Sequence, residues 1–268
     1  MVNFSVGAVV NFSIDVCNQE LLRLFDVYRP SVIVHTASLL SVESRNDPRK
    51  AYKVNIDGWA NVLEAAKQVG AKRIIYASSI AVYGSVDGLR IHEDVPKRPT
   101  STYGITKLAA EHLGERYQDS YGIEFVALRP CHIFGPGRSR GNIVVASVIL
   151  DALSGKVAKI LYGDQLYEVI HVRDCAAAFA LATTKPRMDY RYFNVGPGYQ
   201  IPLSQLAEIV RDHVPGARIE VNPGEDPSRP PRPPLDITRA NTYLGWSPRY
   251  SISDAIRDFV EWVRRRGS

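Results

Sequence analysis

A tyrosine and a lysine four residues apart, Tyr103 and Lys107, are the first residues whose types and spacing could do chemistry. A spacing of four places both side chains on one face of a helix, so the lysine ammonium can lie near the tyrosine phenol. A cation there lowers the phenol pKa, which is about 10 in a free tyrosine, and such a pair can act as a general acid or base. Because the motif is short enough to occur by chance, its surroundings have to support it.

Two serines supply that support, because Ser78 and Ser79 stand at the end of an apolar run that predicts a strand over residues 72–78. Ligands bind at the carboxyl ends of strands in open parallel sheets. A hydroxyl at this place can donate a hydrogen bond to a substrate oxygen while Tyr103 exchanges its proton. The serines and the Tyr103–Lys107 pair together predict a site for a hydroxyl-bearing substrate.

The elements that must position these residues follow an alternating pattern. Short β-branched runs alternate with longer helical patterns, as in βαβ units around a parallel sheet. We expect strands at residues 8–14, 31–36, 72–78, 123–129 and 190–195, and helices at residues 48–69, 103–121, 142–153, 174–183, 203–213 and 252–265. The predicted fold class is α/β, with a Rossmann-like doubly wound parallel sheet.

The last third of the chain differs in composition, since residues 215–234 contain seven prolines and little periodicity. Such a segment runs as extended or turn structure over a surface. We therefore expect a small C-terminal substrate-binding lobe made of residues 151–167 and 197–268. Residues 1–150 and 168–196 are expected to form the Rossmann-like nucleotide-binding domain.

Composition and charge exclude several other classes of protein. The chain has 268 residues with 45% hydrophobic and 23% charged residues, and it has no apolar run near the roughly 20 residues that cross a bilayer. We expect no membrane segment and a cytoplasmic location. Three scattered cysteines and six scattered histidines predict no metal site. The net charge of +5 suits an anionic small molecule, and the basic run at residues 264–266 suits a helix end better than nucleic acid.

Several motifs in order resemble a known family. The pattern strand-Ser-Ser-x-Ala-Val-Tyr-Gly followed by Tyr-Gly-x-x-Lys is similar to the extended branch of the short-chain dehydrogenase/reductase superfamily, which includes NAD-dependent sugar-nucleotide epimerases and dehydratases. The resemblance continues over nearly the whole chain, at residues 34–38, 54–58, 61–66, 128–130, 134–137, 170–174, 193–195 and 244–248.

The resemblance implies roles for single residues. Ser79 is implied as the catalytic hydroxyl, Tyr103 as the acid or base, and Lys107 as its partner and as a contact of the nicotinamide ribose. The implied cofactor is NAD or NADP, with NAD favoured, and the implied cofactor contacts are Asp15, Val16, Thr36, Ala37, Ser38, Asn55, Ala77, Ser78, Tyr103, Lys107 and Pro130. The implied partners are a small-molecule substrate and a second copy of the chain in a homodimer. The candidate substrate contacts are Ser79, His132, Arg140, Arg229 and Arg232.

Two of these roles have alternatives. Asp15 is implied to meet the adenine amino group, but it could instead cap a helix that starts near Asn18. Asn55 is implied to support the active-site backbone. His132 stands where the family often has an asparagine that faces the substrate, although a lone histidine can equally be structural.

The family's usual start is not found in this sequence. Members begin with a strand, a GxxGxxG turn and a helix whose amino end holds the cofactor pyrophosphate. The first expected strand here matches the third strand of the family, so the sheet is expected to be truncated at its N-terminal side. A start at an internal Met, which we favour, a shortened inactive protein, or a partner chain that completes the sheet would each explain this. In each case we expect this chain alone to bind a dinucleotide poorly.

The reaction implied by the resemblance is a hydride transfer with Tyr103 as the acid or base. An epimerase or dehydrogenase acting on a nucleotide sugar is the favoured interpretation. A dehydratase is disfavoured, because Ile80 and Ala81 follow Ser79 where dehydratases have Asp-Glu. A dehydrogenase of a small hydroxy or amino acid, similar to threonine 3-dehydrogenase, and a non-catalytic binding protein stay open.

Overall fold

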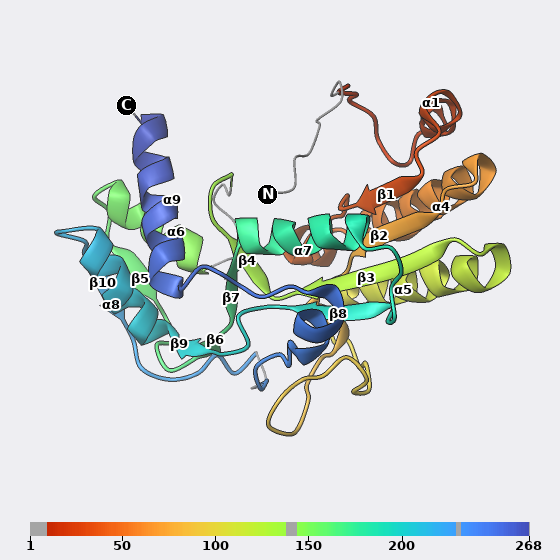
Figure 1. The fold of residues 1–268 in the computed structure, drawn as a ribbon. Helices are drawn as coiled ribbons and strands as arrows, with labels where there is room; N and C mark the ends of the chain where they lie inside the picture. The colour runs from red at the N-terminus through yellow and green to blue at the C-terminus, as the bar shows by residue number, and fades with distance from the viewer. Residues whose placement is uncertain (1–9, 138–143, 229–231, 268) are drawn as a thin grey trace.

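A four-stranded parallel sheet forms the centre of the molecule (Figure 1). The computed structural model describes residues 10–137, 144–228 and 232–267. The strands are β1 (Val32–His35), β2 (Arg73–Ala77), β3 (Glu124–Pro130) and β8 (Tyr192–Val195), in the order β1-β2-β3-β8. Four of the five expected strands and the α/β class are confirmed.

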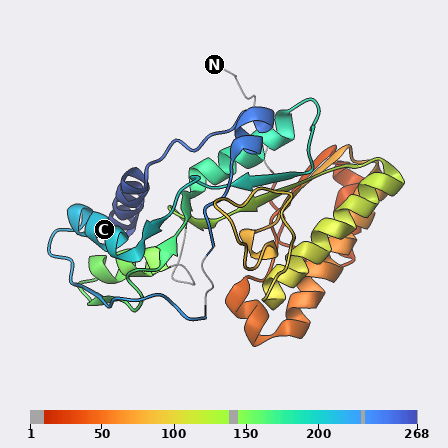
Figure 2. The ribbon, with the colours of Figure 1, turned by 90° about the horizontal axis from the view of Figure 1, so that it is seen from below.

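Helices cover both faces of this sheet (Figure 2). On one face, α1 (Glu20–Tyr28), α4 (Gly58–Val69) and α5 (Thr102–Tyr121) share an apolar core with the strands. On the other face lies α7 (Val172–Thr184), which shares a core with η3 (Ala240–Leu244). The first four residues of β2 are buried and β3 is buried along nearly its whole length, as expected for strands covered on both sides.

The helix expected over residues 48–69 is confirmed in outline, but its middle differs from a regular helix. After α2 (Ser41–Asn46), the chain forms α3 (Pro48–Tyr52), a π-helical turn η1 (Lys53–Asp57) and then α4, which ends at Gly70 in the left-handed conformation. The Asp47 side chain caps α3 by accepting a hydrogen bond from the Lys50 amide at 2.9 Å. The π-helical turn buries Asn55 beside the pocket described below.

A separate lobe packs beside the sheet. It contains α6 (Val144–Leu153), β5 (Ala158–Ile160), α8 (Leu203–His213), β10 (Ile219–Val221) and α9 (Ile252–Gly267) around an apolar core of its own. Two small strand pairs, β4 (His132–Phe134) with β7 (Val169–His171) and β6 (Leu166–Tyr167) with β9 (Ile201–Pro202), add apolar side chains to this core. The division into domains at residue 150 stays a prediction, and α6 packs with the lobe.

The strand expected over residues 8–14 is wrong for the part that the structure describes. Residues 10–14 form no regular element, and residues 8 and 9 lie outside the described residues. The segment lies next to α1, where the Phe12 and Tyr28 rings are 5.1 Å apart, and it pairs with none of the described strands. Apolar alternation alone was misleading here, because a strand also needs a neighbour for its backbone groups.

No helix in the described ranges is long and apolar enough to cross a membrane.

Candidate active site

A pocket of about 530 Å³ opens at the carboxyl ends of β1, β2 and β3, beneath α7. Parallel strands end at the same edge of a sheet, so the residues that follow them meet there. The pocket is lined by Val34, Thr36, Ser38, Leu40, Ser41, Ala77, Ser78, Ser79, Tyr103, Lys107, Pro130, Cys131, His132, Ile133, Val172, Cys175, Ala176 and Phe179. Ser79, Tyr103 and Lys107, which the sequence singled out, therefore face one cavity.

Ser79 is placed by the turn that follows β2. It caps the short 3₁₀ helix η2 (Ile80–Val82), where its Oγ accepts a hydrogen bond from the Ala81 amide at 3.1 Å. The first turn of α5 lies directly against this turn, because a Cβ at Gly104 would be 2.4 Å from the Ala81 carbonyl oxygen. The absence of a side chain at Gly104 thus allows Tyr103 to lie next to Ser79.

Tyr103 and Lys107 lie on the same face of α5, as their spacing predicts. The Lys107 Nζ is 5.6 Å from the centre of the Tyr103 ring and donates a hydrogen bond to the Ala77 carbonyl at 2.7 Å. This bond joins α5 to the end of β2. Lys107 is almost completely buried, so its ammonium has little contact with solvent.

Burial sets the charge state of both groups. It lowers the pKa of Lys107 to about 7, against the opposing effect of the Glu111 carboxylate. Burial also raises the pKa of Tyr103 to about 12, against a hydrogen bond with Ser79. The expected lowering of the tyrosine pKa by Lys107 is therefore wrong for this structure, because desolvation of the phenol is the largest effect on its pKa. At neutral pH the phenol is protonated and can act as a proton donor.

Asn55 connects three parts of the site. Its Oδ1 accepts a hydrogen bond from the Leu39 amide at 2.8 Å, and its Nδ2 donates to the Leu39 carbonyl at 3.1 Å. The same Nδ2 donates to Thr106 Oγ1 on α5 at 3.0 Å. Asn55 thereby joins α5 to the loop after β1, the loop that places Thr36 and Ser38 in the pocket.

Asp15 and Val16 lie away from this pocket. Asp15 lines a separate open hollow with Cys17, and its Oδ1 accepts a hydrogen bond from the Cys17 amide at 2.8 Å, which lowers the pKa of Asp15. The side chain at the start of α1 that accepts from a helix amide is Asn18, whose Oδ1 receives the Glu20 amide at 2.9 Å. The side chain that accepts a hydrogen bond at the start of α1 is therefore that of Asn18, whereas Asp15 accepts from Cys17 ahead of the helix. Val16 packs toward Gly58 of α4.

The candidate substrate contacts fall into two groups. His132 lines the main pocket and also an adjoining hollow of about 40 Å³, which Arg232 lines as well. Arg232 Nη1 donates to the Ile80 carbonyl at 3.3 Å, which places its guanidinium near the η2 turn. Arg140 and Arg229 lie outside the described residues.

Sequence reasoning missed Glu168, which lines the same small hollow. Its carboxylate accepts hydrogen bonds from the Leu235 amide at 3.1 Å and the Gly198 amide at 3.3 Å, and burial raises its pKa to about 7. A single acidic residue inside the apolar run of residues 166–172 was the available signal. Within the described residues, no three His, Cys, Asp or Glu side chains gather into a candidate metal site.

Comparison with known proteins identifies the family. The sequence model of the NAD-dependent epimerase/dehydratase family matches residues 5–196. The chain belongs to this family. It is therefore an NAD-dependent enzyme, which confirms the favoured cofactor and the resemblance to extended short-chain dehydrogenases. Its structural neighbours are Rossmann-fold epimerases, which confirms the expected fold.

Individual relatives agree with this placement. A UDP-glucose 4-epimerase from Mycolicibacterium smegmatis is 30% identical over 94% of this chain and 82% of its own length. A UDP-glucose 4-epimerase from Thermotoga maritima, solved with UDP-glucose, has a TM-score of 0.89 at 27% identity over 99% of this chain and 90% of its own. The Thermus thermophilus UDP-glucose 4-epimerase in complex with NAD has a TM-score of 0.84 at 30% identity over 94% and 83%.

The pocket fits the nicotinamide half of NAD. Its volume lies within the range of cofactor sites, and it combines an apolar wall from α7 with the hydroxyls of Thr36 and Ser78 and the Lys107 ammonium. These groups can hold a ribose by hydrogen bonds. In the described part of the chain, no glycine-rich turn at a helix amino end lies at this pocket to receive a pyrophosphate.

Proposed function

We propose that this protein is a nucleotide-sugar 4-epimerase that inverts a hydroxyl-bearing carbon. The observation that carries the proposal is the meeting of Ser79, Tyr103 and Lys107 in one pocket at the carboxyl ends of the strands. The substrate class is supported by relatives that are UDP-glucose 4-epimerases. An epimerase needs a group that can both take and return a proton at the same oxygen, and a single tyrosine can do this.

Each residue has a defined task in this reaction. The minor phenolate form of Tyr103 takes the proton of the substrate hydroxyl, because the phenol itself, with a pKa of about 12, can only donate one. The carbon that bears the hydroxyl gives up its hydrogen with the bonding electrons, leaving a ketone. NAD, when bound, supplies the reversible hydride acceptor, so no net oxidation results. Ser79 donates a hydrogen bond to the same substrate oxygen, and the Lys107 ammonium stabilises the phenolate. The ketone carbon then takes its hydrogen back, with the bonding electrons, on its opposite face, while Tyr103 returns its proton to the oxygen of this inverted centre.

The small hollow next to the pocket places a cation where a phosphate group of the substrate could approach. Arg232 is a half-buried cation there, and guanidinium groups bind phosphate oxygens in a planar, two-point manner. His132 lines both cavities and can contact the sugar that spans them. The net charge of +5 favours the approach of an anionic substrate.

The test is turnover of UDP-glucose and UDP-galactose by wild type and by Tyr103→Phe in the presence of NAD. Removing the phenolic oxygen should lower kcat by a factor on the order of 10³, while the melting temperature stays close to that of wild type. Tyr117→Phe is the matched control, because Tyr117 lies on the same helix, away from the pocket, and bonds Glu64.

Two results would contradict the proposal. A Tyr103→Phe enzyme that keeps most of its kcat would exclude Tyr103 as the acid or base. A wild-type enzyme that converts no UDP-sugar, but accumulates reduced cofactor with small hydroxy or amino acids, would identify a dehydrogenase of the alternative class.

A further inference from the structure

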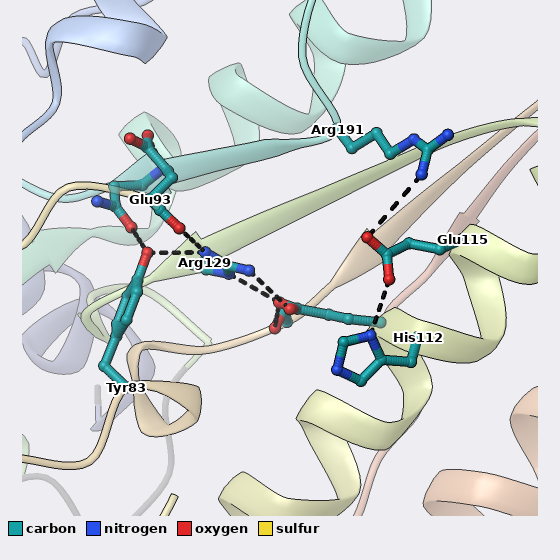
Figure 3. Close-up of polar contacts among 9 residues, drawn as sticks. Tyr83, Glu93, His112, Glu115, Arg129 and Arg191 are labelled. Carbon is teal, nitrogen blue, oxygen red and sulfur yellow. Dashed lines mark hydrogen bonds and ion pairs between the residues drawn. The ribbon is translucent and has the colours of Figure 1, made fainter. Parts of the chain in front are cut away.

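A buried ion pair lies directly behind the pocket. The Arg129 Nε donates to Glu111 Oε1 at 2.8 Å and its Nη2 donates to Oε2 at 2.7 Å, and both side chains are 1% exposed. Arg129 also donates to the Tyr83 hydroxyl and to the Glu93 carbonyl, both at 3.0 Å (Figure 3). A buried pair contributes little net stability, because desolvation of two charges offsets their attraction. Stability alone therefore does not explain why this ion pair is buried here.

Glu111 touches the turn that carries the serines. Ser78 Oγ donates a hydrogen bond to Glu111 Oε1 at 2.5 Å, and Ser78 precedes Ser79 in the chain. Glu111 lies on α5, four residues after Lys107 and eight after Tyr103, so the three share one face of the helix. One carboxylate, held in place by Arg129 of β3, therefore joins the end of β2 to the helix that carries Tyr103 and Lys107.

Glu111 also affects the charge of Lys107. Burial favours the neutral amine, and the Glu111 carboxylate is the nearby charge that opposes it. The other titratable groups around Lys107 are His35 and Tyr76 from β1 and β2 and Tyr103 from its own helix. Those around Glu111 are Arg129, Tyr76, Tyr83, Tyr192 and Lys97.

We propose that Glu111, anchored by Arg129, is a positioning residue for the Ser79, Tyr103 and Lys107 site: it fixes the Ser78-Ser79 turn against α5 and favours the charged form of Lys107. The turnover part of this proposal rests on the proposed function, but the charge of Lys107 does not. A test that reads the lysine directly therefore separates the two.

The experiment compares Glu111→Gln with Glu115→Gln. Glu115 lies one turn farther along the same helix and is 25% exposed. It contacts His112 and Arg191 (Figure 3) and bonds Tyr192, and it makes no ion pair with Arg129 among those that the described residues show. The readout is the pH titration of the Lys107 side chain by NMR of protein carrying labelled lysine, with the Lys107 signal assigned by its loss in Lys107→Met. Glu111→Gln should move the midpoint down by about 1 pH unit or more, whereas Glu115→Gln should leave it unchanged.

A second variant guards against misfolding. Glu111→Gln leaves the Arg129 cation buried without its partner, so the double variant Glu111→Leu/Arg129→Met removes both charges and should fold with a stability close to wild type. Its Lys107 midpoint should lie between those of wild type and Glu111→Gln, because the double variant loses the Glu111 carboxylate but also loses the Arg129 cation, which stays unpaired in Glu111→Gln.

Turnover gives the second readout. In both variants we expect kcat for the UDP-sugar to fall at least tenfold with little change in KM, because the serine turn moves while the substrate end keeps its contacts. A Lys107 midpoint equal to wild type in either folded variant overturns the proposal, and so does a full kcat in the double variant. If wild type turns over no UDP-sugar at an NAD concentration that calorimetry shows to be saturating, the proposed function fails, and the NMR titration still decides the role of Glu111.

Discussion

The two ends of the active-site region are built differently. Ser79, Tyr103 and Lys107 come from one stretch of chain that runs from the end of β2 to the first turns of α5. The adjoining hollow is assembled from segments far apart in the sequence, with His132 from β4, Glu168 beside β6 and Arg232 from the last third. The proposed chemistry is thus held by a strand end and a helix, whereas the proposed substrate contacts depend on how the lobe packs against the sheet.

The same contrast appears in the buried carboxylates. Glu111 pairs with Arg129 through two charged hydrogen bonds. Among the described residues, Glu168 accepts hydrogen bonds from two backbone amides, and burial raises its pKa to about 7 against the attraction of Arg90 and Arg232. The charged hydrogen bonds of Glu111 hold α5 firmly to β3. The amide hydrogen bonds of Glu168 hold the segments at residues 198 and 235 more weakly. Changes at the first end are expected to alter kcat, and changes at the second to alter KM.

Lys107→Met should lower kcat more than any other variant except Tyr103→Phe. Without the ammonium the phenolate is not stabilised, so kcat should fall by a factor on the order of 10². Steady-state kinetics with a UDP-sugar measure this, and calorimetry should show NAD binding weaker than the already weak binding expected of the wild-type chain. An unchanged nucleotide affinity would contradict the contact with the ribose.

The same variant has a predicted pH dependence in stability. The pKa of Lys107 is about 7 in the folded chain and 10.5 for a free lysine, so between these values the unfolded chain binds more protons. The unfolding free energy of wild type should therefore rise with pH over this window, relative to Lys107→Met. Denaturant unfolding at several pH values measures the difference, and a flat difference would contradict the burial of a titrating amine.

Gly104→Ala tests whether close packing of α5 on the η2 turn sets the catalytic geometry. The new Cβ would lie 2.4 Å from the Ala81 carbonyl oxygen, so the helix start must move. We expect a loss of about 1–3 kcal/mol in unfolding free energy and a fall in kcat of about tenfold or more.

Gly114→Ala is the control for that experiment. It lies on the same helix, and its Cβ would meet the Phe125 ring at 2.3 Å, away from the pocket. It should destabilise the protein to a similar degree without lowering kcat in the folded enzyme. Equal kcat losses in both variants would mean that stability, and not the approach of Tyr103 to Ser79, limits the reaction.

Arg232→Ala should have the smallest effect and should act on KM. Loss of one guanidinium contact to a phosphate raises KM by about tenfold, which corresponds to ~1.4 kcal/mol, and leaves kcat close to wild type. High salt should raise the wild-type KM in the same direction. Arg257→Ala, which removes a cation of α9 that pairs with Asp254, is the control. If Arg232→Ala lowered kcat and left KM unchanged, the hollow could not be assigned to substrate binding and the pocket to catalysis.

The parallel sheet, the main helices and the Tyr103–Lys107 pair could be predicted from the sequence, because they depend on local interactions. The spacing of Tyr103 and Lys107 places them on one helix face, Gly70 ends α4, and alternation of apolar runs indicates a parallel sheet. These features depend on backbone geometry within a few residues, which sequence patterns record directly. The motifs that resemble extended short-chain dehydrogenases pointed to the family that the comparisons confirm.

The tertiary structure alone decided the features that depend on distant partners. Residues 10–14 have the pattern of a strand but pair with none of the described strands. The pKa of Tyr103 rises where the Lys107 spacing predicted a fall, because the surrounding chain removes water from both groups. Glu111 meets Arg129, and Glu168 meets the amides of Gly198 and Leu235, only after the sheet and the lobe have packed. Desolvation and long-range pairing are properties of the folded chain, so no local pattern encodes them.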